Sequence, residues 1–271
     1  MNRRSFFQIT RKVCGMNCKN AWQKALKQVK KMVKKTPANN TAFVIGITGS
    51  IGMGKSTVSK MFEHHDIPVN NADDDVHKAM GPGGPAVEAV GKLVPAALAK
   101  DEKGRDYIDR KILSAHVFAD PDDLSMLNEL EKILHPIVGK LREEFVAEQS
   151  AAGHKIVICD IPLLFENGLE KEMDLTLCVS APADVQKQRV LARPNMTEDK
   201  LNSVLDRQMP DAEKRKKADI VLDTSLSLEK TREQVETLVQ DILDGKITKA
   251  QSRKSDARNS RGRGATYGAD S

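Results

Sequence analysis

The chain has 271 residues, of which 39% are hydrophobic, and a formal net charge of +5. This length allows one or two domains with a substantial core. No run approaches the roughly 18 apolar residues that a bilayer-spanning helix needs, so the sequence predicts no membrane span. The charge is unevenly distributed along the chain. Residues 1–40 contain eleven basic and no acidic residues, residues 41–245 contain 25 basic and 36 acidic residues, and residues 246–271 contain seven basic and two acidic residues. An acidic centre disfavours a general nucleic-acid-binding surface, which requires clustered positive charge.

Residues 1–40 form a basic extension in which apolar residues such as Trp22, Leu26 and Val29 recur at helical spacing. The pattern fits an organelle transit peptide. It fits equally a solvated lysine-rich helix, a membrane-surface or RNA contact, or a simple extension. Because serine is scarce for a transit peptide, we expect a cytoplasmic protein, with a mitochondrion or another organelle as the alternative. Cys14 and Cys18 have no second Cys/His pair at zinc spacing, so reduced thiols are expected.

Five short apolar runs predict the strands of one parallel sheet: 43–48, 67–70, 155–160, 174–180 and 219–223. Strands of this near-continuous apolar character are buried on both faces, so we expect helices on both sides of the sheet. Cys159 and Cys178 fall inside two of the runs and are expected to behave as small buried hydrophobes. The predicted fold is α/β, with a doubly wound, parallel, five-stranded sheet.

Two segments interrupt the alternation of strands and helices. Helical patterns over about 76–150 predict an insertion that could hold a second substrate. The basic, helical stretch over about 184–217 is typical of a mobile lid over phosphates. The predicted domain, 41–245, closes with an amphipathic helix over 227–243. Residues 246–271 are predicted to form a disordered basic tail.

The most specific motif directly follows the first apolar run. Its residues, Gly49-Ser-Ile-Gly-Met-Gly-Lys-Ser-Thr57, fit the phosphate-binding loop (P-loop) pattern G-x-x-x-x-G-K-[ST]. Backbone N–H groups of such a loop and the helix N-terminus after it surround nucleotide phosphates. Lys55 would reach the β- and γ-phosphates, and Ser56 would bind Mg²⁺. The predicted nucleotide-binding residues are Gly52, Met53, Gly54, Lys55, Ser56 and Thr57.

A carboxylate, Asp73, follows the second run, at the edge of the sheet where α/β proteins bind ligands. There it can accept a proton from an attacking hydroxyl, as the catalytic base of phosphoryl transfer. Asp74 and Asp75 fit a helix N-terminus, where acidic side chains complement the dipole. Asp160 ends the third run and could orient Mg²⁺ through water or cap a helix. No Asn-Lys-x-Asp segment is present, which disfavours a GTPase.

The ordered motifs from 43 to about 225 resemble the dephospho-coenzyme A kinase family. Besides the P-loop, the similar stretches are Ala72-Asp73 with His77, Pro82-Gly83-Gly-Pro85, Ile108-Asp109-Arg110, Val117-Phe118, Ile133-Leu134-His135-Pro136, Asp160-Ile-Pro-Leu-Leu-Phe-Glu166, Gln186 with Arg189 and Arg193, Arg207-Gln208, and Ala218-Asp219-Ile-Val221. They span roughly two thirds of the chain. The Pro162-Leu-Leu-x-Glu166 segment and His135-Pro136 are far more restrictive than the P-loop itself.

The resemblance implies a P-loop kinase that uses ATP and Mg²⁺ to phosphorylate the ribose 3′-hydroxyl of dephospho-coenzyme A, the last step of coenzyme A synthesis. It places Lys55, Asp73 and Arg193 in catalysis, Arg193 by neutralising charge on the transferred phosphoryl group. It places His77, Arg110 and Glu166 near the acceptor. His135 fits a substrate contact and a buried core histidine equally well.

Three positions depart from the family pattern. Asn71 stands where the family has a first carboxylate, Met53 where it has a small residue, and Thr224 where it has asparagine. Two other functions stay open: another P-loop kinase acting on nucleosides, nucleotides or small metabolites, and a non-catalytic nucleotide-binding module with nucleic-acid-binding tails. The sequence does not define the oligomeric state, and a monomer is our expectation.

A protein truncated to residues 41–245 is expected to retain full kinase activity, because every matched motif lies within it. Neither excluded segment carries enough apolar surface to compensate its own ordering entropy. Activity and thermal unfolding of the truncated and full-length proteins, measured side by side, check this. A large drop in melting temperature would mean that the helical pattern around Trp22 packs on the domain.

Overall fold

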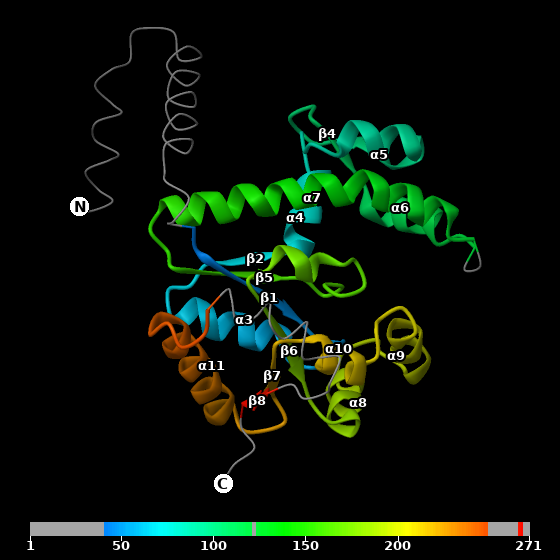
Figure 1. The fold of residues 1–271 in the computed structure, drawn as a ribbon. Helices are drawn as coiled ribbons and strands as arrows, with labels where there is room; N and C mark the ends of the chain where they lie inside the picture. The colour runs from blue at the N-terminus through cyan, green and yellow to red at the C-terminus, as the bar shows by residue number, and fades with distance from the viewer. Residues whose placement is uncertain (1–40, 121–122, 249–264, 268–271) are drawn as a thin grey trace, which may run out of the picture. The chain divides into compact units, whose positions relative to one another are not determined.

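The computed structural model describes residues 41–120, 123–248 and 265–267 (Figure 1). The basic extension 1–40 lies outside these ranges, and so do its proposed targeting role and the Cys14–Cys18 pair. The cytoplasmic assignment and its organelle alternative therefore stay predictions. Within the described ranges, no helix is both long and apolar enough to cross a membrane.

Five parallel strands form the central sheet in the order β2-β5-β1-β6-β7. They are β1 (Phe43–Thr48), β2 (Val69–Asn71), β5 (Ile156–Asp160), β6 (Leu175–Ser180) and β7 (Ile220–Asp223). Each coincides with one of the predicted apolar runs, so the parallel five-stranded sheet is confirmed. The first strand lies in the middle, hydrogen-bonded to β5 on one side and β6 on the other. The P-loop that follows it therefore emerges at the centre of the sheet edge.

The C-terminal boundary differs from the prediction in two ways. A sixth strand, β8 (Ala265–Tyr267), pairs in parallel with β7, so these three residues do not fit the predicted disordered tail. An edge strand such as β7 presents unpaired backbone groups that another segment can bind. In addition, Ile247 packs against the core and Lys246 pairs with Asp241 at 2.9 Å. The folded domain thus continues past residue 245, to at least 248. Truncation at 245 removes these contacts, so part of any fall in melting temperature of the 41–245 protein would come from Lys246 and Ile247 and not from residues 1–40.

Helices cover both faces of the sheet, as the doubly wound prediction requires. On one face, Ile45 and Ile47 of β1 join a cluster with Phe62 of α3 (Lys55–His64) and Leu238 of α11 (Leu228–Leu243). On the other face, Val44 packs in a separate cluster with residues of β5, β6 and β7. This alternation follows from the two-residue period of a strand.

Cys159 and Cys178 lie in the second of these clusters and are fully buried free thiols. Desolvation by burial raises the pKa of each thiol to about 12. A thiol with such a pKa supplies almost no thiolate at neutral pH, so it reacts and binds metals poorly. The expectation that both behave as small hydrophobes is confirmed.

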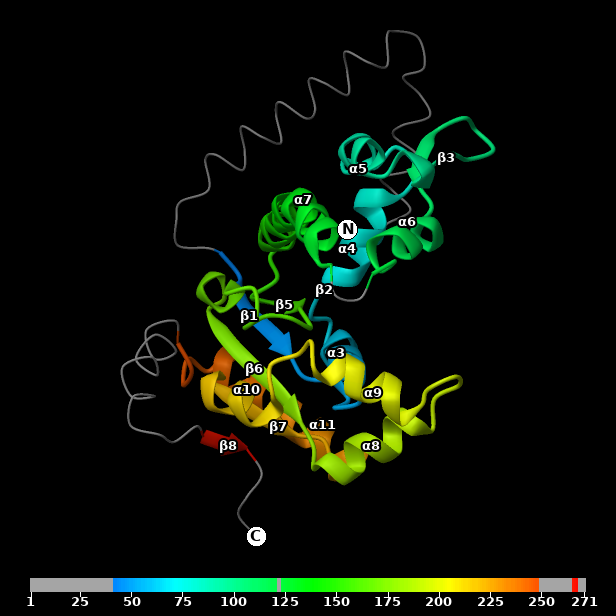
Figure 2. The same cartoon turned by 90° about the vertical axis from the view of Figure 1, so that its right-hand side faces the viewer.

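The insertion between β2 and β5 is largely helical, as predicted (Figure 2). It contains α4 (Ala72–Met80), α5 (Val87–Leu93), the 3₁₀ turn η1 (Pro95–Ala97), α6 (Arg110–Val117) and α7 (Ser125–Ala151). These elements share a hydrophobic cluster of their own, in which Ala79, Val90, Leu113 and Leu134 are buried. The insertion is therefore a small folded body with a separate core.

One part of the insertion was predicted wrongly. The helical pattern predicted over about 76–150 is interrupted after α5, which ends at Leu93, and a hairpin follows, made of β3 (Leu98–Lys100) and β4 (Asp106–Ile108). The turn is stabilised by Asp101, whose carboxylate accepts backbone hydrogen bonds from Lys103 and Arg105 at 2.9 and 2.8 Å. Such local carboxylate bonds compete with helix formation.

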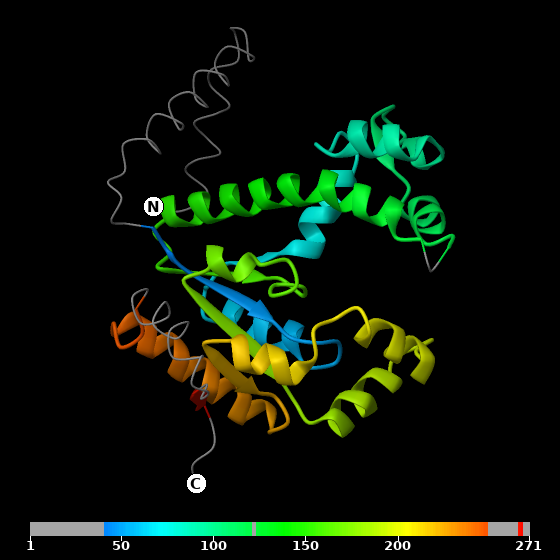
Figure 3. The same cartoon turned by 45° about the vertical axis from the view of Figure 1, so that its right-hand side comes forward.

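The basic stretch predicted as a lid forms three helices, α8 (Ala183–Leu191), α9 (Glu198–Leu205) and α10 (Asp211–Lys217). In Figure 3, α8 and α9 (yellow-green and yellow) lie below the insertion and to the right of the strands of the sheet. The helices confirm the helical part of the prediction, whereas the mobility of the lid stays a prediction. A further 3₁₀ turn, η2 (Leu169–Glu172), lies between β5 and β6.

Candidate active site

The P-loop has the backbone geometry that its glycines allow. Gly52 and Gly54 adopt φ values of +80° and +91°, in the left-handed region that side chains rarely occupy. Space is also short, because a Cβ at Gly52 would lie 2.5 Å from Cγ2 of Val190. The loop then passes directly into α3, which begins at Lys55 with Gly54 as its N-cap. The positive end of the helix dipole thus lies where phosphates are expected.

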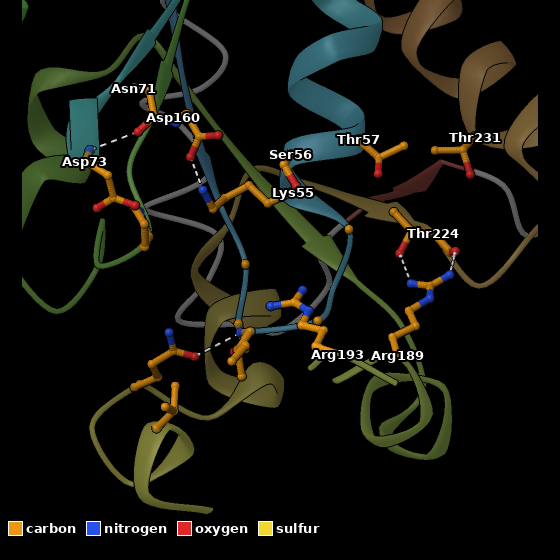
Figure 4. A pocket seen from close by; sticks show the side chains of 18 of the residues that line it. Lys55, Ser56, Thr57, Asn71, Asp73, Asp160, Arg189, Arg193, Thr224 and Thr231 are labelled. Carbon is orange, nitrogen blue, oxygen red and sulfur yellow. Dashed lines mark hydrogen bonds and ion pairs between the residues drawn. The ribbon is translucent and has the colours of Figure 1, made fainter. Parts of the chain in front are cut away.

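The P-loop opens into a cavity of about 650 Å³. It is lined by most of the predicted nucleotide-binding residues, Gly52, Gly54, Lys55, Ser56 and Thr57, together with Asp73, Asp160, Arg189, Arg193 and Thr224 (Figure 4). Met53 does not line it: its side chain is 2% exposed, and its sulfur accepts a hydrogen bond from the backbone of Ala181 at 3.1 Å. Met53 thus contributes its backbone to the loop, which explains how a large residue fits there.

Lys55 is held at the floor of this cavity by Asp160. Its ammonium group forms an ion pair with Oδ1 of Asp160, while the hydroxyl of Ser59 donates to Oδ2 at 2.8 Å (Figure 4 shows the ion pair). Asp160 is only 1% exposed. A buried carboxylate is tolerated when it is paired and hydrogen-bonded, so Lys55 and Ser59 together account for its burial. Helix capping by Asp160 is not observed among these contacts.

Asp73 lies in the first turn of α4, at the end of β2. The helix is capped by Asn71, whose side-chain oxygen accepts from the backbone N–H groups of Asp73 and Asp74 at 2.9 and 3.4 Å. The asparagine at 71 thus has a capping role, and the Asp73 carboxylate extends toward the cavity. Asp75 is buried against Asn70, whose amide donates to it at 2.7 Å.

A second cavity, of about 680 Å³, lies between α7 and the segment after β5. Its walls include Leu134, His135, Arg142, Leu163 and Leu169. Asp73 and Pro162 line both cavities, so the two spaces meet at these residues. His135, which fitted two interpretations in the sequence, is placed at this cavity. Arg142 is buried in the wall and pairs with Glu172, an interaction that the sequence did not indicate.

The lid contributes two arginines to the first cavity. Arg193 is exposed and lines it, whereas the guanidinium of Arg189 donates to the hydroxyl and the carbonyl of Thr224 at 3.1 and 2.6 Å. The Thr224 hydroxyl in turn lies 2.7 Å from the carbonyl oxygen of Met53. Two of the departures from the family pattern, Met53 and Thr224, are thus in direct contact.

Two lid glutamines hold the P-loop at a single residue. The side chain of Gln208 accepts from the N–H of Ile51 at 3.1 Å, and that of Gln186 donates to its carbonyl at 2.7 Å. The sequence placed both glutamines in matching motifs without assigning them a role. Their contacts with Ile51 were not predictable from the sequence, because Ile51 lies more than 130 residues away from each glutamine in the chain.

Three residues predicted near the acceptor line neither cavity. The guanidinium of Arg110 donates to Nε2 of His77, at the exposed junction of α4 and α6. Glu166 packs instead against the lid: its Oε1 lies 2.9 Å from the ammonium of Lys214 and accepts from the backbone of Met209 at 2.8 Å. The geometry therefore does not place Glu166 among the cavity walls.

Comparison with known proteins identifies close relatives of this chain. A family model described as dephospho-CoA kinase matches residues 43–230. The chain is 48% identical to the dephospho-CoA kinase of Novosphingobium aromaticivorans over 200 residues, 74% of this chain and 94% of the relative. Among solved structures, it resembles TT1252 from Thermus thermophilus (35% identity, TM-score 0.61, 76% of this chain and 98% of that one). It also resembles the dephospho-CoA kinase of Campylobacter jejuni (25%, TM-score 0.58, 75% and 98%).

Replacing Lys214 by methionine is expected to destabilise the protein. Lys214 is completely buried, and it contacts the Pro162 carbonyl at 3.0 Å as well as Glu166. Removing one partner of a buried pair costs about 3–5 kcal/mol, and the lower end is expected because Glu166 keeps its Met209 bond. Urea unfolding measures the loss. The matched control, Lys216→Met on the exposed side of the same helix, should cost less than about 1 kcal/mol. Equal losses in the two variants would contradict the assignment.

Proposed function

The chain belongs to the dephospho-CoA kinase family, and on this basis we propose that it transfers the γ-phosphate of ATP to the ribose 3′-hydroxyl of dephospho-CoA, giving coenzyme A and ADP. The observation that carries this proposal is the position of Asp73 between two cavities, one formed by the P-loop and one beside α7. Phosphoryl transfer requires a donor site and an acceptor site that meet at a group able to take the proton of the attacking hydroxyl.

The P-loop cavity suits the triphosphate of ATP. The N–H groups of Gly52 to Thr57 and the N-terminus of α3 would surround the phosphates. Lys55 starts from its ion pair with Asp160 and would bind the β- and γ-phosphates. Arg193 is an exposed lid cation on the same cavity and would neutralise charge that develops on the transferred group.

The residues present also fit Mg²⁺. This ion keeps several waters and binds through one or two protein groups together with substrate phosphates. The Ser56 hydroxyl lines the cavity beside Lys55 and would provide the direct ligand. Asp160 would act through water, since both of its oxygens are engaged by Lys55 and Ser59. Bound there, the ion would neutralise phosphate charge and orient the γ-phosphate.

The second cavity suits the acceptor. Most of the surface that lines it is apolar, as expected for a site that buries a long, partly apolar molecule. Asp73 would take the proton from the 3′-hydroxyl as that oxygen attacks phosphorus. His77 lies one helical turn after Asp73 on the same face of α4, and with Arg110 would contact the acceptor at the outer margin. The contacts of Glu166 favour a positioning role through Lys214.

The acceptor preference is tested directly by measuring ADP release with a panel of acceptors. The purified full-length protein should release ADP with ATP and Mg²⁺ only when dephospho-CoA is present. Turnover with nucleosides or nucleoside monophosphates, and none with dephospho-CoA, would instead indicate another P-loop kinase. Nucleotide binding without any turnover, together with RNA affinity that depends on the basic tails, would indicate a non-catalytic module.

Replacing Asp73 by asparagine is expected to lower turnover by about 10²-fold or more while ATP binding stays nearly intact, because a general base is lost without a change of shape. The matched control is Asp74→Asn. Asp74 is the next residue in the same helical turn, is exposed, and lines neither cavity, so its turnover should stay near that of the wild type. Steady-state kinetics and nucleotide titrations give both quantities. Near-normal turnover of Asp73→Asn would assign the base elsewhere, with Asp160 as the first alternative.

A further inference from the structure

Three consecutive residues between α9 and α10 contact three different parts of the protein. Arg207 contacts the helical insertion, Gln208 contacts the P-loop, and Met209 contacts the segment that follows β5. We call residues 207–209 the bridging segment. Its position matters because these three parts form the walls of the two cavities.

The contact with the insertion is a cation–π interaction. The guanidinium carbon of Arg207 lies 5.2 Å from the centre of the Phe118 ring, within the distance at which such pairs attract. Phe118 is the C-cap residue of α6, and its side chain is 44% exposed. A large exposed aromatic ring stabilises the insertion little by burial. Its contact with a lid arginine therefore links two bodies rather than filling the core of either one.

The next two residues fix the bridging segment on the opposite side. Gln208 lines the P-loop cavity and accepts from the N–H of Ile51 at 3.1 Å. Met209 donates its N–H to Glu166 at 2.8 Å, and Glu166 is held by the buried Lys214. A change in the position of the P-loop therefore reaches Arg207 through a single peptide unit.

We propose that the bridging segment couples the two substrate sites, so that a nucleotide in the P-loop cavity tightens binding of the acceptor in the second cavity. A nucleotide that orders the P-loop also orders Gln208, and hence Arg207 over Phe118. An acceptor that then binds beside the insertion has less ordering entropy to overcome. By thermodynamic linkage, the acceptor tightens nucleotide binding by the same factor. This inference rests on the proposed function, since it takes dephospho-CoA as the acceptor.

The coupling is measured by calorimetric titration of the full-length protein with dephospho-CoA, with and without a saturating non-hydrolysable ATP analogue and Mg²⁺. The ratio of the two dissociation constants is the coupling factor. In the wild type we expect a factor of about five or more, within the usual range for coupled sites. Direct contact between the two bound ligands also contributes to the coupling factor. The contribution of the bridging segment is therefore measured as the change in this factor when its residues are substituted.

Phe118→Leu keeps an apolar side chain but removes the aromatic face, and Phe118→Tyr keeps the face. Leucine is expected to lower the coupling factor by about two- to five-fold, the value of an exposed cation–π contact, and tyrosine to restore it. Arg207→Gln should match the leucine variant, and the double variant should lower the factor no further. If Phe118 only stabilised the fold, the Phe118→Leu and Phe118→Tyr variants would have the same coupling factor whenever their melting temperatures are equal.

The two glutamines on Ile51 provide a second comparison. Gln208→Leu and Gln186→Leu each remove one hydrogen bond to the same residue, so both should weaken binding of the ATP analogue. Only Gln208 belongs to the bridging segment, so only its variant should lower the coupling factor. Equal factors in the wild type, Phe118→Leu and Gln208→Leu would overturn the coupling and leave the proposed function intact. Absence of any dephospho-CoA binding in the wild type would overturn both.

Discussion

The buried carboxylate of Asp160 determines much of the site around it. It ends β5, the strand next to β1, and it is nearly inaccessible to water. A lone charge in that position would cost several kcal/mol. The Lys55 ammonium and the Ser59 hydroxyl, both from the first turns of α3, remove that cost. These contacts fix the start of α3 against β5. Because the P-loop runs from the end of β1 to the start of α3, the positions of both of its ends are fixed.

The parts of this fold that follow local rules were predictable from the sequence. The strands are β-branched apolar runs, and burial on both faces makes such runs conspicuous. The P-loop could be located to the residue because its glycines, lysine and serine each have a separate physical requirement. The hairpin after α5 was missed because a carboxylate turn at Asp101 overrides the helical pattern before it.

The remaining features of the site depend on contacts between residues far apart in the chain. Glu166 ends a motif that the resemblance placed near the acceptor, yet its partner Lys214 lies on another helix, and no pattern along the sequence pairs them. The same holds for Arg189 with Thr224, and for the two glutamines on Ile51. Sequence motifs indicated which residues to consider, whereas burial and distance separate those that line a cavity from those that position other groups.

The separate core of the insertion has an evolutionary consequence. Its apolar residues pack mainly among α4, α5, α6 and α7, and not with the strands of the sheet. Substitutions there can accumulate without disturbing the packing beneath the P-loop, because the two cores share few side chains. In a fold divided in this way, substitutions in the insertion can change which acceptor is bound, while selection preserves nucleotide binding by the sheet and the P-loop.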